Sequence, residues 1–367
     1  MKKRLGIAAA IALAILVILP AGSLYYEYSA GASCVRCHEI RRNYDEWQAS
    51  SHRGVQCADC HGGMATLDAG FHLGNVRRLV QHISGGFSDP VRLRSQDIPR
   101  LMDRCRACHQ QEFAQWQSST HSATYTNIFL DQKYNRQHPL IDDCLRCHGM
   151  HFEGGIRDLV SPLDANGPWR LLRSELAKQP VIPCLTCHQM HRHGERLTQA
   201  AARQERTGNP AAAERARPGL ALFDRREQQH FALDLLPLPA MREGTRSIGA
   251  SPDQRQALCY QCHAPQASAQ VASGDDRTPI GVHEGLSCLA CHQKHGQQTR
   301  ASCADCHPRL SNCGLDVEKM DTTFVNTKSA HNVHFVKCAD CHRGGVPRRR
   351  ERGPDGPTAS AIRGAPR

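Results

Sequence analysis

The sequence predicts a mainly α-helical chain with extensive loops and little β-structure, and three observations lead to this fold class. Aromatic residues make up only 5% of the 367 residues, too few for a conventional apolar core along the whole chain. The segments between the recurring motifs are rich in Ala, Arg, Gln and Gly and lack the alternating Val, Ile and Tyr runs of strands. The pentapeptide Cys-x-x-Cys-His recurs nine times, about once every 40 residues. The interior is therefore expected to form around whatever this motif binds.

The pentapeptide has the chemistry of a haem c attachment site. Its two thiols add to the haem vinyl groups, and the following His becomes the proximal ligand of the iron. The nine copies use 18 of the 19 cysteines, so nine covalently bound haems are predicted to form the core. The predicted thioether cysteines are Cys34, Cys37, Cys57, Cys60, Cys105, Cys108, Cys144, Cys147, Cys184, Cys187, Cys259, Cys262, Cys288, Cys291, Cys303, Cys306, Cys338 and Cys341. The predicted proximal ligands are His38, His61, His109, His148, His188, His263, His292, His307 and His342.

Other uses of Cys-x-x-Cys explain the pattern less well. Zinc sites take such units in pairs and need no His after each one, whereas nine is an odd number. A thioredoxin-like motif occurs once beside a strand–helix pattern, and a disulfide framework has no reason to repeat one spacing. The remaining cysteine, Cys313, has no intrachain partner in this scheme; a buried thiol is favoured over an intermolecular bridge.

Thirteen of the 22 histidines lie outside the motifs, enough to give each of nine irons a second imidazole. The favoured distal ligands are His52, His121, His151, His191, His283, His295 and His334. His151, His191 and His295 each lie three residues beyond a motif His, too close to reach the same iron. They are expected to serve a neighbouring haem and to tie consecutive haems into a chain. Irons with two His ligands transfer electrons rather than bind substrates.

The formal net charge of +11 does not indicate nucleic-acid binding. Each haem carries two propionates, so nine haems would bring roughly nine or more negative charges and leave the loaded protein near neutrality. Many Lys and Arg side chains are therefore expected to pair with propionates or to lie on the solvated surface.

The amino terminus is predicted to anchor the chain in the cytoplasmic membrane. Residues 2–4 are basic and precede an uncharged run over residues 5–24, which is long enough to span a bilayer. The charge bias predicts a cytoplasmic amino terminus, one membrane pass and a periplasmic haem domain. The alternative is a cleaved signal peptide, for which residues 21–23 provide a cleavage site. In either case the haem domain is exported.

Residues 1 to about 155 resemble the NapC/NirT family of membrane-anchored tetrahaem quinol dehydrogenases. The resemblance is carried by the anchor, four haem motifs and the intervening Tyr44, Trp47, His52, Gly85, Gly86 and His121 in the family's order. It implies electron uptake from the quinol pool in anaerobic respiration. Two positions depart from the family: Ile40 replaces a frequent Met, and no Lys occurs between residues 5 and 132, where the family's quinol pocket has one. Arg77 or Arg78 is a potential substitute.

The predicted organisation is therefore an anchor over 1–24, a tetrahaem module over 25–155, a pentahaem module over 156–345 and a disordered basic tail over 346–367. A hinge or exposed helices are expected near 195–250. The expected function is electron transfer from the quinol pool along the haems to a periplasmic reductase, another cytochrome or an outer-membrane conduit, rather than enzymatic catalysis. Two alternatives remain open: a reductase of nitrite, hydroxylamine or tetrathionate with one open iron, and a polymerising extracellular scaffold.

Overall fold

The structure, a computed structural model, describes residues 2–29, 31–32, 34–62, 69–86, 93–191, 219–238, 240–263, 277–296, 333–337, 339 and 344. Within these ranges, short helices joined by loops predominate, and the strands form two-stranded antiparallel sheets. The prediction of a mainly helical chain with extensive loops is thus confirmed. The eighth and ninth motifs, Cys313, His193 and the predicted basic tail lie outside the described residues.

The amino-terminal part is the most helical. Its elements are α1 (Lys2–Tyr28), η1 (Cys34–Arg36), α2 (His38–Ala49), α3 (Cys57–His61) and α4 (Ala69–Ile83). Helix α1 exposes apolar side chains along its length; Leu13 and Leu16, for example, are 64% and 70% exposed. Across the described residues, no helix is both long enough and apolar enough to cross a membrane.

The middle of the chain alternates short helices with loops. Its elements are η2 (Ser95–Asp97), α5 (Ile98–Cys108), α6 (Gln110–Gln117), η3 (Thr120–Ser122), α7 (Tyr125–Phe129), α8 (Gln132–Asn135), η4 (Asp142–Arg146), α9 (Ile156–Leu159), β1 (Val160–Ser161), β2 (Arg170–Leu171), η5 (Ser174–Leu176) and η6 (Cys184–Thr186). A compact apolar cluster around Phe129, Leu145 and Leu159 holds this part together. The cluster also includes Tyr125 and Val181, so it packs residues from both sides of the predicted 155/156 boundary.

The carboxy-terminal described part contains β3 (Ala221–Asp224), β4 (Gln229–Ala232), η7 (Leu233–Leu235), β5 (Arg242–Glu243), β6 (Arg246–Ser247), α12 (Gln256–Tyr260), η8 (Gly281–His283) and α13 (Cys288–Cys291). Residues 219–250 belong to the segment for which a hinge or exposed helices were expected. Their described part instead forms two hairpins, β3–β4 and β5–β6. The first hairpin is ordered because Leu222 and Phe223 are buried against Ala257 of α12.

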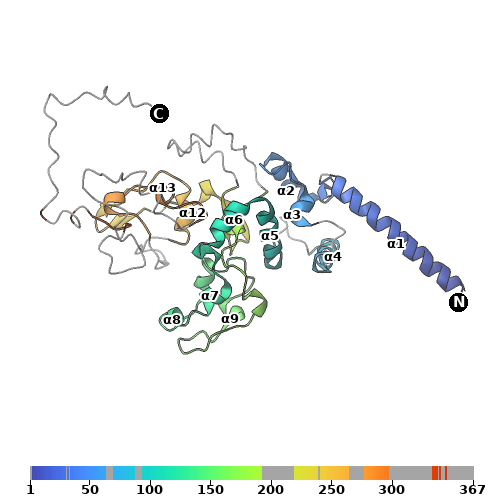
Figure 1. The fold of residues 1–367 in the computed structure, drawn as a ribbon, viewed down its shortest axis with the longest axis horizontal. Coiled ribbons are helices and arrows are strands. Elements are labelled where there is room, and N and C mark those ends of the chain that lie inside the picture. The colour runs from blue at the N-terminus through green and yellow to red at the C-terminus, as the bar shows by residue number, and fades with distance from the viewer. Residues whose placement is uncertain are drawn as a thin grey trace, which may run out of the picture.

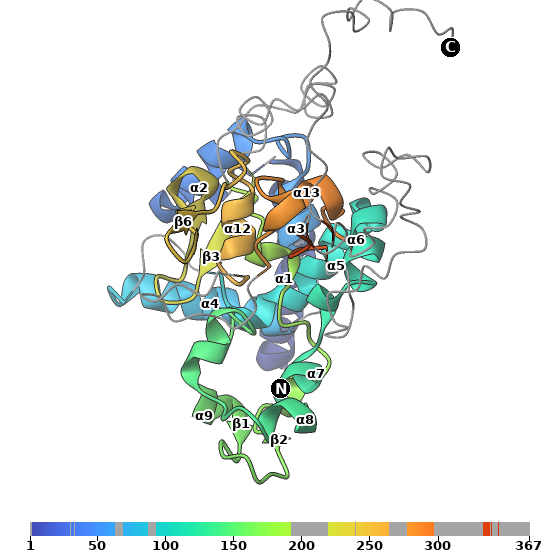
Figure 2. The ribbon, with the colours of Figure 1, turned by 90° about the vertical axis from the view of Figure 1, so that its left-hand side faces the viewer.

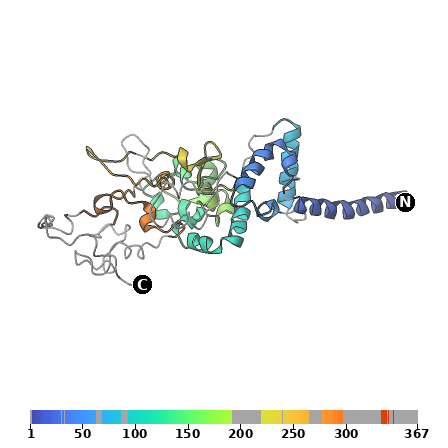
Figure 3. The same cartoon turned by 90° about the horizontal axis from the view of Figure 1, so that it is seen from above.

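The elements follow one another along an elongated molecule. Helix α1 projects from one end of the body, α2 to α5 come next, and α12 and α13 lie toward the other end (Figures 1 and 3). In the view along the body α3, α5, α12 and α13 overlap (Figure 2), whereas Figure 1 shows them one after another along its length. The cysteine motifs carried by these elements are therefore spread along the length of the body.

Candidate haem-binding site

The described Cys-x-x-Cys-His motifs form short helical turns. In chain order they are the first to the seventh motif, and they lie on η1, α3, the end of α5, η4, η6, α12 and α13 respectively. In five of them the backbone N–H of the motif His donates to the carbonyl of the first Cys, at 2.8 to 3.0 Å, as at His109, His148, His188, His263 and His292. Residues three and four apart share one face of a helical turn. The two sulfurs and the imidazole of each motif are thus directed to one side, as attachment to a single porphyrin requires.

Six motif histidines face a second imidazole across a short gap. The ring-centre separations are 5.6 Å for His38–His82, 6.1 Å for His109–His52, 5.8 Å for His61–His191, 6.3 Å for His263–His121, 6.0 Å for His188–His295 and 6.1 Å for His292–His334. A metal–imidazole bond is about 2 Å long, so two imidazoles on opposite sides of one ion have ring centres roughly 6 Å apart. The six pairs therefore fit an iron between the rings, which is the arrangement of a bis-His haem.

A repeated local structure presents His52 and His121. Each follows the pattern Trp-x-x-Ser-x-His. The Ser50 hydroxyl donates to Trp47 O at 2.8 Å and accepts from the His52 N–H at 3.1 Å. The equivalent distances at Ser119 are 2.7 Å to Trp116 O and 3.3 Å from the His121 N–H. Two turns of the same shape thus direct imidazoles at two different motifs.

The tryptophans of this repeat bind backbone carbonyls further along the chain. Trp47 Nε1 donates to His52 O at 2.9 Å and to Val55 O at 3.2 Å. Trp116 Nε1 donates instead to Ile182 O at 3.1 Å. Trp47 therefore closes its own turn, whereas Trp116 fastens the second turn to the segment that precedes the fifth motif.

Two other facing histidines are fixed through the backbone. His191 Nδ1 lies 2.9 Å from Asn43 O, so its Nδ1–H donates there and Nε2 remains as the iron-binding nitrogen. The segment carrying His334 pairs with η8: Ile280 N–H donates to His334 O at 2.7 Å, and Val282 N–H donates to Val336 O at 2.9 Å. Contacts between distant segments thus determine which imidazole faces which motif.

The first motif contains an additional acidic group. Glu39 is buried, its Oε1 lies 3.5 Å from His38 Nε2, and it also contacts His82 Nδ1. A hydrogen bond from its own backbone amide lowers the pKa of the Glu39 carboxyl, and the neighbouring His38 and His82 lower it further. Together they outweigh burial, which raises this pKa. At His82 the carboxylate contacts Nδ1, so it would orient that ring with Nε2 as the iron-binding nitrogen and increase its basicity, whereas at His38 it lies against Nε2 itself.

One continuous cavity of about 3260 Å³ connects the motifs. The second to seventh motifs line it with both cysteines and the His, and Cys34 of the first motif lies at its edge. Small-molecule pockets usually have volumes of about 300–1,000 Å³, so this space suits several large groups rather than one. Haem c fits these residues because paired sulfurs, opposed imidazoles and an extended cavity occur together.

Burial favours the neutral, metal-binding form of several imidazoles in the cavity. Burial is the main cause that lowers the pKa of His61 to about 4, and the positive charges of the nearby His191 and Arg78 lower it further. Burial also lowers the pKa of His52, His121 and His292. Only a deprotonated ring nitrogen can act as a ligand, so at neutral pH these side chains need not lose a proton to bind iron.

Basic side chains outnumber acidic ones around the cavity. Its lining contains Arg78, Arg94, Arg100, Arg104, Arg146, Arg255, Arg277 and Lys294, against Asp97, Glu112, Asp131 and Asp143. This excess of four positive charges complements groups that carry propionates. Burial, followed by Arg94, lowers the pKa of the Arg78 guanidinium, although Arg78 lies 3.7 Å from the Asp97 carboxylate.

Sulfur atoms of different motifs lie close together. Burial, followed by the neighbouring Cys184, raises the pKa of Cys105 to about 11. Cys262 hydrogen-bonds to Cys147, which lowers the pKa of Cys147 and raises that of Cys262. Once haem is attached these sulfurs become thioethers and no longer titrate. The positions of the sulfurs still show that the third motif lies close to the fifth, through Cys105 and Cys184, and the fourth close to the sixth, through Cys147 and Cys262.

Helical Cys-x-x-Cys-His turns, opposed imidazoles and a shared cavity together define a class of protein: the chain is a multihaem c-type cytochrome. Comparisons with known proteins agree. Residues 29–205 match the family model described as outer membrane cytochrome MtrC/MtrF-like, domains II/IV. The chain is also 26% identical over 165 residues to the cytochrome c-type protein NrfH of Wolinella succinogenes, an alignment covering 43% of this chain and 89% of that protein. No solved structure matches the chain.

The structure brings most of the predicted distal histidines opposite a motif His. His52, His121, His191, His295 and His334 all belong to the facing pairs. His283 lines the cavity, and its Nδ1 lies 2.8 Å from Val333 O.

Two histidines depart from the sequence expectation. His151 is buried outside this cavity, where its ring stacks on Phe223 at 4.1 Å and burial lowers its pKa to about 3. His82, which was not among the favoured ligands, faces His38. It lies in the last turn of α4, and its pairing depends on α4 folding back toward α2, which no local sequence pattern indicates.

Proposed function

We propose that the chain is a nonahaem, membrane-anchored electron-transfer protein that takes electrons from the quinol pool and passes them to a periplasmic redox partner. The observation that carries this proposal is the set of six facing imidazole pairs around one continuous cavity. Haem iron supplies the one-electron chemistry when bound. The residues of the chain close both axial positions of each such iron, which favours electron transfer over substrate binding.

The first motif is the proposed entry point. Five residues separate it from the end of α1, and Arg36 within it donates to the Tyr25 hydroxyl at 2.9 Å, with its guanidinium 5.7 Å from the Tyr25 ring centre. This contact ties the motif to the carboxy-terminal end of α1.

The proposed membrane anchor is α1; this part of the proposal rests on the sequence, because no helix of the described residues meets the length and apolarity needed to cross a membrane. Support comes from the basic residues that precede its apolar run and from the exposed apolar side chains along it, such as Leu16 and Ile18. The NapC/NirT resemblance favours quinol as donor and a periplasmic redox partner, and the similarity to the cytochrome c-type protein NrfH agrees with an electron-transfer role. Of the two potential substitutes for the Lys of the NapC/NirT quinol pocket, Arg77 and Arg78, the cavity is lined by Arg78.

Removal of the first attachment site tests the entry assignment. In membranes carrying Cys34→Ala/Cys37→Ala, quinol should no longer reduce the remaining haems above the rate seen without the protein, while dithionite still reduces them fully. The matched control is Cys338→Ala/Cys341→Ala at the ninth motif, which also lacks one haem but should be reduced by quinol at the rate of the unmodified protein. Normal quinol reduction in the first variant would contradict the assignment.

A further inference from the structure

Two of the facing histidines come from positions immediately beyond a motif. His191 lies three residues after His188 of the fifth motif, and its ring faces His61 of the second motif at 5.8 Å. His295 lies three residues after His292 of the seventh motif, and its ring faces His188 at 6.0 Å. Neither serves a motif next to its own in the sequence, so ligand sharing here does not follow chain order.

This arrangement limits how far apart the corresponding irons can lie. Three residues span at most about 10 Å even when fully extended. His188 and His191 must therefore hold two irons within a short distance of each other, and the same holds for His292 and His295. The fifth motif takes part in both relationships. It is followed by His191, which faces the second motif, and its own His188 faces His295, which follows the seventh motif.

The scaffold around the fifth motif also joins two parts of the molecule. On one side it packs on α5, which ends in the third motif: Leu185 contacts Ile98 and Met102, and Cys184 N–H lies 3.2 Å from Met102 Sδ. On the other side the Ala221 N–H of β3 donates to Cys187 O at 3.1 Å. Strand β3 in turn packs on α12, which carries the sixth motif.

We propose that the fifth motif is the junction of the haem array, with His61 and His191 binding one iron and His188 and His295 binding another. The route from the amino-terminal motifs to the seventh then runs directly through the fifth. The fourth motif lies beside the sixth, with Cys147 hydrogen-bonded to Cys262, and is not an obligatory step between the third and the fifth. Because the inference concerns the path within the electron-transfer chain, it rests on the function proposed above.

Counting altered haems in double variants tests these ligand assignments. In the oxidised, fully loaded protein, each of His61→Ala, His191→Ala, His188→Ala and His295→Ala should convert one haem from a low-spin to a high-spin EPR signal. The doubles His61→Ala/His191→Ala and His188→Ala/His295→Ala should each still alter one haem. The control double His188→Ala/His191→Ala, whose residues are three apart in sequence, should alter two.

Two altered haems in either of the first doubles, or one in the control, would overturn the junction. If an alanine variant fails to fold, the matching Met variants keep an axial ligand, and the count becomes the number of haems whose reduction potential rises. These measurements need no quinol and no partner. Failure of the proposed function would instead appear in the unmodified protein, as an absence of quinol reduction or as a native high-spin haem.

Discussion

At the scale of single residues, Trp47 shows how one side chain determines the position of a ligand. Its indole N–H holds the two carbonyls of the turn that carries His52. His52 and His121 were among the distal ligands favoured from the sequence. The sequence could not reveal that they face His109 and His263, because those pairings depend on long-range packing.

We expect Trp47→Phe to loosen the His52 turn while keeping an aromatic ring in place. Loss of two hydrogen bonds should destabilise this turn by about 1–2 kcal/mol and change the low-spin EPR signal of one haem. The matched control is Trp169→Phe. Trp169 Nε1 also donates to a backbone carbonyl, Asp164 O at 3.0 Å, but the turn that it closes contains no His. Identical EPR spectra for Trp47→Phe and the unmodified protein would contradict this role.

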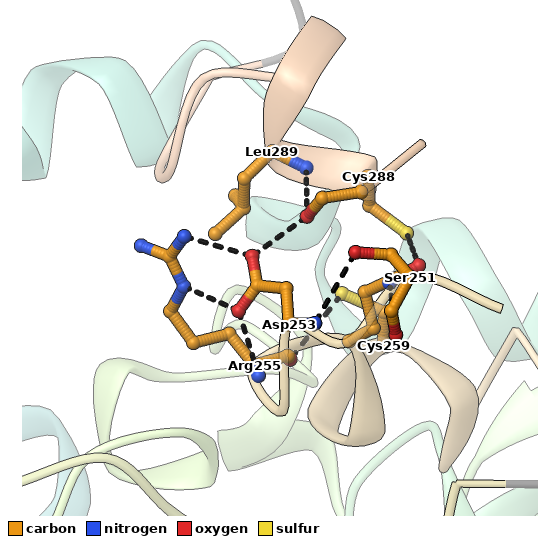
Figure 4. A network of polar contacts seen from close by, with 8 residues as sticks. Ser251, Asp253, Arg255, Cys259, Cys288 and Leu289 are labelled. Carbon is orange, nitrogen blue, oxygen red and sulfur yellow. Dashed lines mark hydrogen bonds and ion pairs between the residues drawn. The ribbon is translucent and has the colours of Figure 1, made fainter. Parts of the chain in front are cut away.

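Asp253 joins the sixth and seventh motifs through a buried network (Figure 4). Its carboxylate pairs with Arg255 at 2.7 Å and accepts from the Ser287 hydroxyl at 2.7 Å. Burial raises the pKa of Asp253, but Arg255 and Ser287 outweigh it and hold the pKa below its ordinary 3.8. The stabilisation is therefore fully present above about pH 4 and lost as the pH falls through the lower folded-state pKa.

Asp253→Asn should accordingly lower the free energy of unfolding by about 1–3 kcal/mol at pH 7, and the deficit should shrink as the pH falls below 3.8. Denaturant midpoints at several pH values measure it. Asp103→Asn serves as control, since Asp103 pairs with Arg106 at 3.2 Å on the exposed surface, where such pairs contribute little. A deficit for Asp253→Asn that does not change with pH would show that the carboxylate charge plays no part.

At the scale of elements, the turns formed by the Cys-x-x-Cys-His motifs were predictable from sequence, but the elements that pack against them were not. Cys-x-x-Cys-His specifies a helical turn by itself, and each described copy forms one. The hairpin β3–β4 was not foreseen, because an isolated run such as Ala221–Asp224 does not stand out without its packing on α12. The segment presenting His334 is likewise positioned by pairing with η8 rather than by local sequence.

Gly281 is where that pairing is most constrained. Its φ of +76° favours glycine, and an added Cβ would overlap the carbonyl oxygen of Val336. We expect Gly281→Ala to displace the segment carrying His334 and to alter the low-spin signal of the haem held by His292. Gly285→Ala is the control, because Gly285 has a similar φ of +81° but its nearest neighbour, Gly249 O, lies 4.0 Å from the added Cβ. Equal spectral changes in the two variants would exclude the collision as the cause.

At the scale of the whole molecule, the sequence predicted the class of protein but not the order of its parts. Haem attachment followed from the repeated motif, whereas export, which was inferred from the amino-terminal run, stays a prediction. The sequence also suggested that neighbouring histidines connect consecutive haems. The structure places His191 and His295 opposite motifs distant in the chain, because α5, β3 and α12 bring those motifs together.

Membrane attachment by α1 is testable on the full chain. If α1 anchors the protein, haem staining should remain with the membrane pellet after an alkaline carbonate wash, because the apolar helix is buried in lipid rather than held by charge. A variant whose residues 2–28 are replaced by a cleavable signal peptide should appear in the soluble periplasmic fraction with the same reduced spectrum. Release of the full chain by the wash would contradict the anchor.

The most direct test of the account is EPR spectroscopy of the fully oxidised protein, combined with a measurement of haem per chain. The six opposed imidazole pairs predict six low-spin ferric haems, and the proposed electron-transfer role extends this to the other three motifs, giving nine haems per chain and no high-spin signal. A high-spin ferric signal amounting to one haem per chain would contradict the account, because it would reveal an iron open to substrate and favour a reductase.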